Sequence, residues 1–320
     1  MTGRARLISI AAAFVIGLLV VEVLARVLVS AAEADEVVWY DASTQLRVEM
    51  LDRLSGVDMV FAGTSSAWQG LVPQVFVDEG AADSAFNVGL AGGVPPVTAP
   101  WLIDEVVPRV DPDMVVWGLT SLDFSPSYGD TNQESYEDAF ATRKGWLAEL
   151  DRQTSEVSEL VRSRRLLRSP SKLWGREQDE IQDDLAEAAA VLGSDGERLD
   201  FAQDTGEERA AIMAARVLDY QLDTTDVDRV RDAVQTLLDQ GREVVLVEVP
   251  LPDRFVVLHP NGAADIATAS AAIDAIAAEF GLPVLRTTET FTDEDFVDFS
   301  HLTAEAATRF SADIADQLAA

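Results

Sequence analysis

Short apolar segments alternate with helical patterns over most of the chain. The segments are rich in valine, and the stretches between them carry apolar residues at the three- to four-residue spacing of an amphipathic helix. Apolar strands separated by helices favour a parallel sheet that is covered on both faces. The pattern therefore predicts a three-layer α/β/α sandwich with a mainly parallel five-stranded sheet. The expected strands are 57–63, 85–89, 113–120, 243–249 and 283–286, and the expected helices are 69–77, 98–110, 226–240, 266–280 and 304–318, the last with Thr303 as its N-cap.

A long polar insertion separates the third expected strand from the fourth. It covers about 126–225, is mostly helical in pattern, and lies where loops leave the carboxyl ends of the strands. Ligands bind at that edge of open α/β sheets, so the insertion is expected to form a helical lid. The α/β domain as a whole is expected over 57–320, after a polar connector at 33–56.

The first part of the chain, 1–32, is predicted to be a cytoplasmic tip followed by a transmembrane signal-anchor. Residues 7–29 are almost all apolar, and as a helix they would cover roughly 35 Å, against a hydrocarbon core of about 30 Å. Glu22 and Arg26 interrupt the run four residues apart, so they can pair on one face. Arg4 and Arg6 precede it, which predicts a single-pass cell-membrane protein with a cytoplasmic N-terminus and an extracytoplasmic domain.

A cleaved signal peptide is the alternative for this segment. Small residues at Ala32 and Ala34 stand where a signal peptidase needs them. Either interpretation exports the domain.

Composition excludes several classes of site and partner. The chain of 320 residues has 24 basic and 56 acidic residues and a net charge of −32, so a nucleic-acid partner is not expected. It has no cysteine, hence no disulfide and no thiolate ligand or nucleophile. With only His259 and His301 to supply imidazole, no metal site and no cofactor are predicted.

Basic residues gather at one place, inside the insertion. A solvated helix face is one explanation, and contact with anionic lipid headgroups or an acidic surface polymer is the other. The cluster consists of Arg162, Arg164, Arg165, Arg168, Lys172 and Arg176.

Ser65 is the first candidate for chemistry. It follows the first expected strand on the turn that opens a helix, in Gly63-Thr64-Ser65-Ser66. Backbone N–H groups at such a turn can stabilise an oxyanion. A serine there is also an ordinary helix N-cap, so the position alone decides nothing.

Asp298 and His301 supply what a serine nucleophile needs. They are three residues apart in the loop before the last expected helix. The carboxylate can fix the imidazole tautomer through one ring nitrogen while the other nitrogen takes a proton from a serine hydroxyl. A wound α/β sheet brings the first and last loops to the same edge, so Ser65 and His301 are expected to meet there.

With these motifs the chain resembles the SGNH, or GDSL-like, hydrolase superfamily, in particular its membrane-anchored bacterial members related to cell-surface O-acyltransferase proteins. Gly63-Thr64-Ser65, Asn87-Val88-Gly89 and the Asp298/His301 pair look like three of the four family blocks. The resemblance implies Ser65 as nucleophile, His301 as base, Asp298 as its orienting acid, and the amides of Ser65 and Gly89 as oxyanion donors.

The third family block is where the chain departs from the pattern. The family's asparagine donor is absent from the segment that runs from Gly118 to Asp123. Thr120 or Ser121 could donate from a hydroxyl instead, and loss of one donor costs about 3 kcal/mol of transition-state stabilisation.

Four further residues are expected near the substrate. Asn87 belongs to the second block, Asp123 follows the third, and His259 lies in the loop after the fourth expected strand; Trp68 follows Ser65 and either lines the pocket or packs under the lid. For His259 an ordinary turn residue is the competing interpretation.

The resemblance implies an exported, membrane-tethered serine esterase or O-acyltransferase acting on acyl esters of cell-surface glycans. Water or a sugar hydroxyl would accept the acyl group, and the residues do not choose between them. The alternative is a catalytically weak module that binds a surface polymer or a partner membrane protein. A solute-binding domain is a third hypothesis. It is disfavoured because a two-lobed binding protein needs two comparable α/β halves, and the predicted strands are enough for one sheet.

Overall fold

The computed structural model describes residues 3–31, 42–128, 154, 158–162, 178–199 and 202–320. They belong to two compact units, one formed by residues 1–45 and 141–186 and the other by residues 46–140 and 187–320. The suggested cleavage site at Ala32 and Ala34 lies outside the described residues, as does the basic cluster beyond Arg162.

The first unit contains one long helix, α1 (Gly3–Ala31), and the short α9 (Glu159–Arg162) that contacts it. The predicted pair is present, since Arg26 Nε donates to Glu22 Oε1 at 2.8 Å. Among the residues that the structure describes, no helix is long and apolar enough to cross a membrane.

The second unit is built on a five-stranded parallel sheet in the order β2-β1-β3-β4-β5. This confirms the predicted sheet, with each strand one or two residues shorter than expected because its ends turn into loops. The pairing of β1 with β3 sets Gly63 opposite Gly118, so the segments that follow these two strands leave the sheet side by side. The strands are β1 (Met59–Gly63), β2 (Ala85–Asn87), β3 (Met114–Leu119), β4 (Glu243–Glu248) and β5 (Val284–Arg286).

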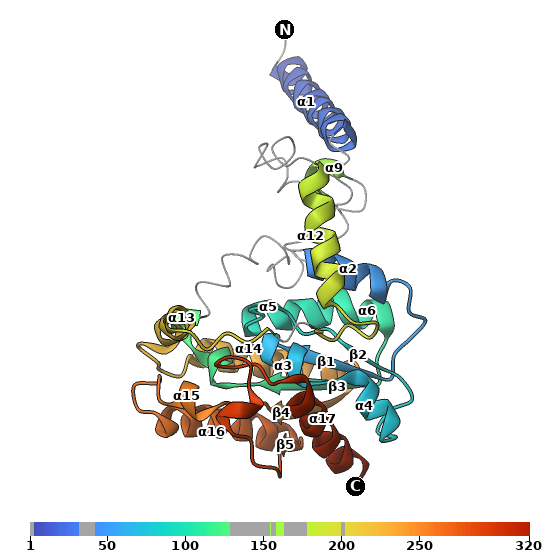
Figure 1. Ribbon diagram of the computed structural model, residues 1–320. Helices are drawn as coiled ribbons and strands as arrows, with labels where there is room; N and C mark the ends of the chain where they lie inside the picture. Colours follow the sequence, from blue (N-terminus) through green and yellow to red (C-terminus); the bar gives the residue numbers. More distant parts are fainter. Residues whose placement is uncertain (1–2, 32–41, 129–153, 155–157, 163–177, 200–201) are drawn as a thin grey trace. The chain divides into compact units, whose positions relative to one another are not determined.

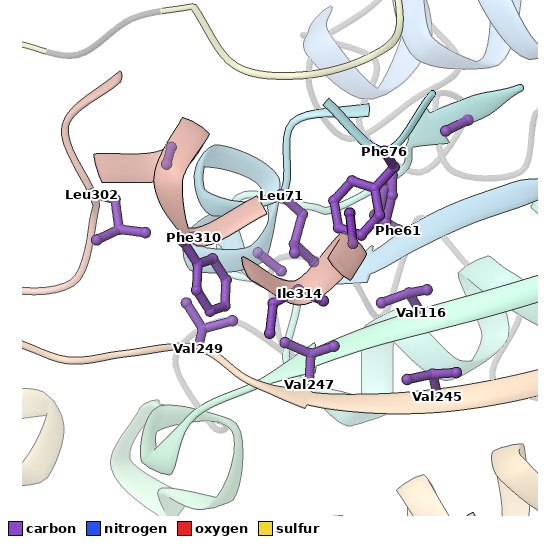
Figure 2. Close-up of a cluster of buried hydrophobic side chains, with 14 of the residues drawn as sticks. Phe61, Leu71, Phe76, Val116, Val245, Val247, Val249, Leu302, Phe310 and Ile314 are labelled. Atoms are coloured by element: carbon purple, nitrogen blue, oxygen red, sulfur yellow. The ribbon is translucent and has the colours of Figure 1, made fainter. Parts of the chain in front are cut away.

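Helices α3 (Ser65–Gly70), α4 (Pro73–Asp78) and α17 (Ala304–Ala319) cover one face of this sheet (Figure 1). Figure 2 shows their apolar side chains interlocked with those of β1, β3 and β4 in a buried cluster. Burial of this apolar surface, at about 25 cal/mol per Å², fixes the helices on the sheet. Among its members are Phe61, Leu71, Phe76, Val116, Val247, Leu302, Phe310 and Ile314.

The remaining described helices are α2 (Ala42–Leu51), α5 (Pro95–Pro100), α6 (Val107–Val110), α12 (Gln178–Val191), α13 (Glu207–Val217), α14 (Thr224–Asp239), α15 (Asp253–Val256) and α16 (Ala263–Phe280). Three-residue or four-residue 3-10 turns occur at Ser121–Phe124 (η3) and Asp293–Asp295 (η4), and a π-helical segment at Trp101–Val106 (η2) joins α5 to α6. Helix α14 contacts both α5 and α16 and packs on β4. These helices form a further layer.

The helix expected at 69–77 is two helices instead. The chain is extended at Leu71 and Val72, and α4 begins at Pro73. Proline has no amide proton and disfavours helical backbone in the residue before it, so it ends the first helix and opens the second. The predicted N-cap of the last helix is confirmed, because the Thr303 hydroxyl accepts from the amide of Ala306 at 3.2 Å.

Candidate active site

Ser65 is the first residue of α3, directly beyond the end of β1. Thr64 is the N-cap, its hydroxyl accepting from the amide of Ser66 at 3.4 Å, so Ser65 is not the cap. The turn is tight: Gly63 has φ of +137°, and a Cβ there would lie 2.3 Å from the Gly118 carbonyl oxygen. A glycine at this position lets α3 start directly above the sheet edge.

His301 reaches Ser65 from the far end of the chain. Its Nε2 lies 2.8 Å from Ser65 Oγ, and its Nδ1 lies 2.8 Å from Oδ2 of Asp298. The prediction that the first and last loops bring these three side chains together agrees with the geometry. The loop that holds Asp298 and His301, residues 296–302, is closed at its base by an antiparallel bridge between Phe296 and Leu302.

Asp298 is held on both carboxylate oxygens. Its Oδ1 accepts from the amides of Ser300 and His301 at 2.8 and 2.9 Å. Its Oδ2 faces His301 and also accepts from Nη2 of Arg209 at 2.7 Å. Burial of Asp298 favours its neutral form, but the hydrogen bond and charge of His301, the Ser300 amide and Arg209 together outweigh burial and hold the pKa of this carboxyl well below its usual range.

An ionised Asp298 decides the proton positions on His301. A carboxylate can only accept, so Nδ1 carries the ring proton and donates it. Nε2 is then the free acceptor and faces the Ser65 hydroxyl, which donates to it. This is the arrangement in which a histidine can remove the proton of a serine nucleophile.

Arg209 is the residue that the sequence did not reveal. It lies in α13, inside the insertion, and belongs to none of the recognised motifs. Arginines are scattered over this polar stretch, and nothing in the order of residues distinguishes Arg209 from its neighbours.

The expected oxyanion donors differ in their availability. The amide of Ser65 is at the first position of α3, where a helix has no internal acceptor for it. The amide of Gly89 donates to Asn87 Oδ1 at 2.9 Å. The Gly89 amide is therefore engaged within its own turn, whereas the Ser65 amide lies at the start of a helix.

The Thr120 and Ser121 hydroxyls are also engaged. Thr120 Oγ1 and the Thr120 amide donate to Asp123 Oδ2 at 3.0 and 2.7 Å. Ser121 Oγ lies 3.0 Å from Nε2 of His259. Neither hydroxyl replaces the missing asparagine donor in this arrangement.

Asn87 proves to be a structural residue, which corrects its expected place at the substrate. It is fully buried, and its Nδ2 donates to the carbonyls of Ala67, Trp68 and Leu71 at 3.1, 3.2 and 2.7 Å. It thereby binds carbonyls at and just beyond the C-terminal end of α3, among them that of Ala67, which also accepts from the amide of Leu71 at 3.0 Å.

Asp123 is a second correction. Its carboxylate faces the N-terminus of η3 and forms a capping box with Thr120, and the residue is 1% exposed. Burial, with a smaller effect of Asp226, raises the pKa of Asp123 to about 7. A carboxyl so enclosed acts on its own loop and not on a substrate.

Trp68 and His259 are buried as well and so do not line an open surface. The Trp68 indole donates to the Gly196 carbonyl at 2.7 Å, and the guanidinium of Arg47 stacks 4.5 Å above its ring. Nδ1 of His259 faces the carbonyl of Phe255 at 3.3 Å. Both side chains therefore make their contacts inside the fold.

No group of three or more histidine, aspartate or glutamate side chains in the described part of the chain is arranged to hold a metal ion. The side chains around Ser65 are a hydroxyl, an imidazole, a carboxylate and a guanidinium, which suit proton transfer and acyl chemistry.

Comparison with known proteins gives neighbours of one kind. No family model matches the sequence, and no curated protein does. Among solved structures, the chain is similar to a putative acylhydrolase from Bacteroides fragilis, with 12% identity, a TM-score of 0.45, and coverage of 87% of this chain and 96% of that one.

Two further solved structures are esterases. Est24, a carbohydrate acetylesterase from Sinorhizobium meliloti, has 14% identity and a TM-score of 0.38, with 82% of this chain and 98% of that one covered. An aryl esterase from M. smegmatis has 12% identity and a TM-score of 0.37 over the same shares. By their names, these three structures are an acylhydrolase and two esterases.

Proposed function

We propose that the chain is an SGNH-like serine esterase in which Ser65 is the nucleophile, His301 the general base and Asp298 its orienting acid. The observation that carries the proposal is the continuous chain of contacts from Ser65 Oγ through His301 to Asp298, each 2.8 Å long. Three side chains in this order suit the activation of a hydroxyl for attack on an ester.

The reaction follows from the proton positions. Ser65 Oγ attacks the acyl carbonyl carbon while its proton moves to Nε2 of His301. The amide of Ser65 faces the developing oxyanion, and the tetrahedral intermediate collapses as the C–O bond to the alcohol breaks. His301 returns the proton to that alcohol, and the acyl group remains on Ser65.

The second half of the reaction repeats these steps with another nucleophile. A water or a sugar hydroxyl gives its proton to His301 and attacks the acyl carbon; the C–O bond to Ser65 then breaks, and His301 returns the proton to Ser65 Oγ. Water yields hydrolysis and a sugar hydroxyl yields transfer. The proposed substrate class, acyl esters of cell-surface glycans, comes from the resemblance to O-acyltransferase proteins.

Attachment to the cell membrane is also a proposal, supported by the apolar run at 7–29. The side chains described from Ile16 onward along α1 are largely exposed, including Leu19, Val23 and Val27. Fractionation of cells that express the full chain tests the attachment: recovery in the carbonate-washed membrane pellet supports it, and recovery in the soluble fraction contradicts it.

The activity is tested with the full chain in mild detergent. Hydrolysis of p-nitrophenyl acetate is compared among the wild type, Ser65→Ala and His301→Ala, with Ser66→Ala as the matched control for the adjacent serine. We expect the first two variants to lose at least about 10³-fold in kcat and the control to retain activity within a few-fold. Equal rates in the wild type and Ser65→Ala would refute the proposal.

A second candidate function is a binding module with little turnover. It is favoured by the engagement of the Gly89 amide and of the Thr120 and Ser121 hydroxyls with other partners. A serine-reactive fluorophosphonate separates the candidates: an esterase labels at Ser65 and turns over esters, whereas a module with a decayed site does neither.

A further inference from the structure

Arg209 and the proposed base, His301, contact the same carboxylate oxygen of Asp298. Its Nη2 lies 2.7 Å from Asp298 Oδ2, and Nδ1 of His301 lies 2.8 Å from the same atom. The side chain of Asp298 is 6% exposed and that of Arg209 is 22% exposed. Solvent therefore screens this ion pair much less than a pair on the open surface.

A second contact ties the same segment to the same loop. The amide of Asp204 donates to the carbonyl of Val297 at 2.9 Å, just before α13 begins at Glu207. The insertion is thus joined to the loop at 296–302 through its backbone and through Arg209. These two contacts hold the segment that carries Arg209 against the loop that carries Asp298.

The charge of Arg209 opposes protonation of His301. An ionised Asp298 alone would attract a proton onto the imidazole and convert it to imidazolium, which cannot accept a proton from Ser65. A guanidinium on the shared oxygen offsets part of that attraction and still keeps the carboxylate ionised and oriented.

The other charged groups nearby have different partners. Arg309 pairs with Asp295 at 2.8 Å and with Glu289. From α3, the group that faces His301 is the Ser65 hydroxyl. In the described part of the chain, the ion-pair partners of Asp298 are Arg209 and His301.

We propose that Arg209 is a positioning residue for the Ser65–His301–Asp298 triad, which fixes Asp298 and keeps His301 in its neutral, proton-accepting form to lower pH. Its kinetic consequence rests on the proposed esterase function. The proposed effect on the His301 imidazole can also be measured without turnover.

The test is an NMR pH titration of the full chain in mild detergent. The sequence has only two histidines, so the ring signals of His301 are assigned by comparison with His259→Phe. Arg209 and the His301 imidazole contact the same oxygen of Asp298. Removal of the Arg209 cation is therefore expected to raise the titration midpoint of the imidazole by about one pH unit. We expect this shift in Arg209→Gln and at most a third of it in Arg209→Lys, which keeps the charge.

Arg309→Gln is the matched control, since it removes another arginine–aspartate pair three residues from Asp298. It should leave the His301 midpoint unchanged. Should Arg209→Gln lower the unfolding temperature substantially, Arg209→Met, which retains the apolar stem, repeats the measurement. An unchanged midpoint in folded Arg209→Gln or Arg209→Met, or equal shifts in Arg209→Gln and Arg209→Lys, would overturn the proposal.

The kinetic experiment separates the two proposals. The acid limb of kcat/KM for p-nitrophenyl acetate should move to higher pH in Arg209→Gln, with up to about 10-fold lower rates below the limb. If the wild type is active and the variant has the same profile, the role of Arg209 is refuted and the esterase stands. If the wild type neither turns over nor labels, the esterase is refuted, and the NMR titration still decides the role of Arg209.

Discussion

The hydroxyl of Ser121 and Nε2 of His259 form a buried pair 3.0 Å apart, close to the edge of the sheet that carries Ser65. Burial lowers the pKa of His259, so its ring is neutral near pH 7. Because Nδ1 faces a carbonyl, it carries the proton, and Nε2 accepts from Ser121. Among the residues that the structure describes there are therefore two serine–histidine pairs, and of these the Ser65–His301 pair has a carboxylate on the other ring nitrogen.

This pair predicts a stability effect without a catalytic one. Ser121→Ala leaves the buried Nε2 of His259 without its partner, and the free energy of unfolding should fall by about 1–3 kcal/mol. Esterase activity at saturating substrate should stay within a few-fold of the wild type. Urea unfolding and p-nitrophenyl acetate hydrolysis measure the two effects.

A double-mutant cycle provides the control. His259→Phe removes the polar partner, so Ser121→Ala should cost less in that background than in the wild type. Additive losses would show that the two side chains do not interact in solution, and a large loss of kcat in Ser121→Ala would restore Ser121 as an oxyanion donor.

Asp298→Asn should abolish most of the activity and leave the fold intact. The amide group of an asparagine would face Arg209 and Nδ1 of His301 with a donor, which favours the imidazole tautomer whose Nε2 carries the proton. That tautomer cannot accept from Ser65, so kcat should fall by about 10³–10⁴-fold at neutral pH. Steady-state kinetics and circular dichroism check both parts. Asp295→Asn, which removes the partner of Arg309 instead, should retain activity; comparable rates in the two variants would exclude Asp298 as the orienting acid.

The buried carboxyl of Asp123 predicts a pH-dependent stability. Burial raises the pKa of Asp123 to about 7 in the folded chain, so the native state binds a proton that the unfolded state releases near pH 4. This contribution is present in full below pH 4 and is lost as the pH rises through 7. The whole change is roughly 4 kcal/mol.

Asp123→Asn removes this titration. The difference in unfolding free energy between variant and wild type should move in favour of the variant from pH 4.5 to pH 8, whatever its value at low pH. Urea unfolding at four pH values measures the trend, with the exposed Asp239→Asn as control. A difference that is constant with pH would contradict the raised pKa.

Gly196 carries a prediction about the loop that covers Trp68. Its φ is +78°, and a Cβ there would lie 2.2 Å from the carbonyl oxygen of Asn87. Gly241 has nearly the same backbone, with φ of +79°, and no atom within 4 Å of such a Cβ. Alanine costs about 1–2 kcal/mol of backbone strain at either site, but only at Gly196 must it also displace Asn87.

Thermal unfolding of Gly196→Ala and Gly241→Ala separates these two contributions. We expect the loss at Gly196 to exceed that at Gly241 by 2 kcal/mol or more, since the displaced atom is backbone. Equal losses in the two variants would mean that the loop at Gly196 does not lie against β2 in solution.

The sheet was predictable from sequence because β1 to β4 are largely buried on both faces, so nearly every position in them is apolar. The pairing of Ser65 with Asp298 and His301 was predictable for a related reason: parallel strands bring their following loops to one edge. The split of the expected helix at 69–77 was indicated by Pro73, which the apolar periodicity obscured.

The substrate residues were less predictable because a loop at the functional edge can also fold back on itself. Asp123 caps its own turn, and Asn87 bonds to carbonyls near the end of α3, although Asp123 follows β3 and Asn87 ends β2 at that edge. Arg209 was missed for the opposite reason. Its partner is 89 positions away, and only the path of the insertion brings the two together.

The contact between Ser65 and His301 joins residues 236 positions apart. Closing so long a loop is slow compared with forming α16 or α17, whose contacts are local. In refolding from denaturant, helical signal would therefore return before ester turnover does. Recovery of activity would report the formation of this long-range contact. The delay between the helical signal and the activity would measure how slowly Ser65 and His301 come together after the local helices have formed.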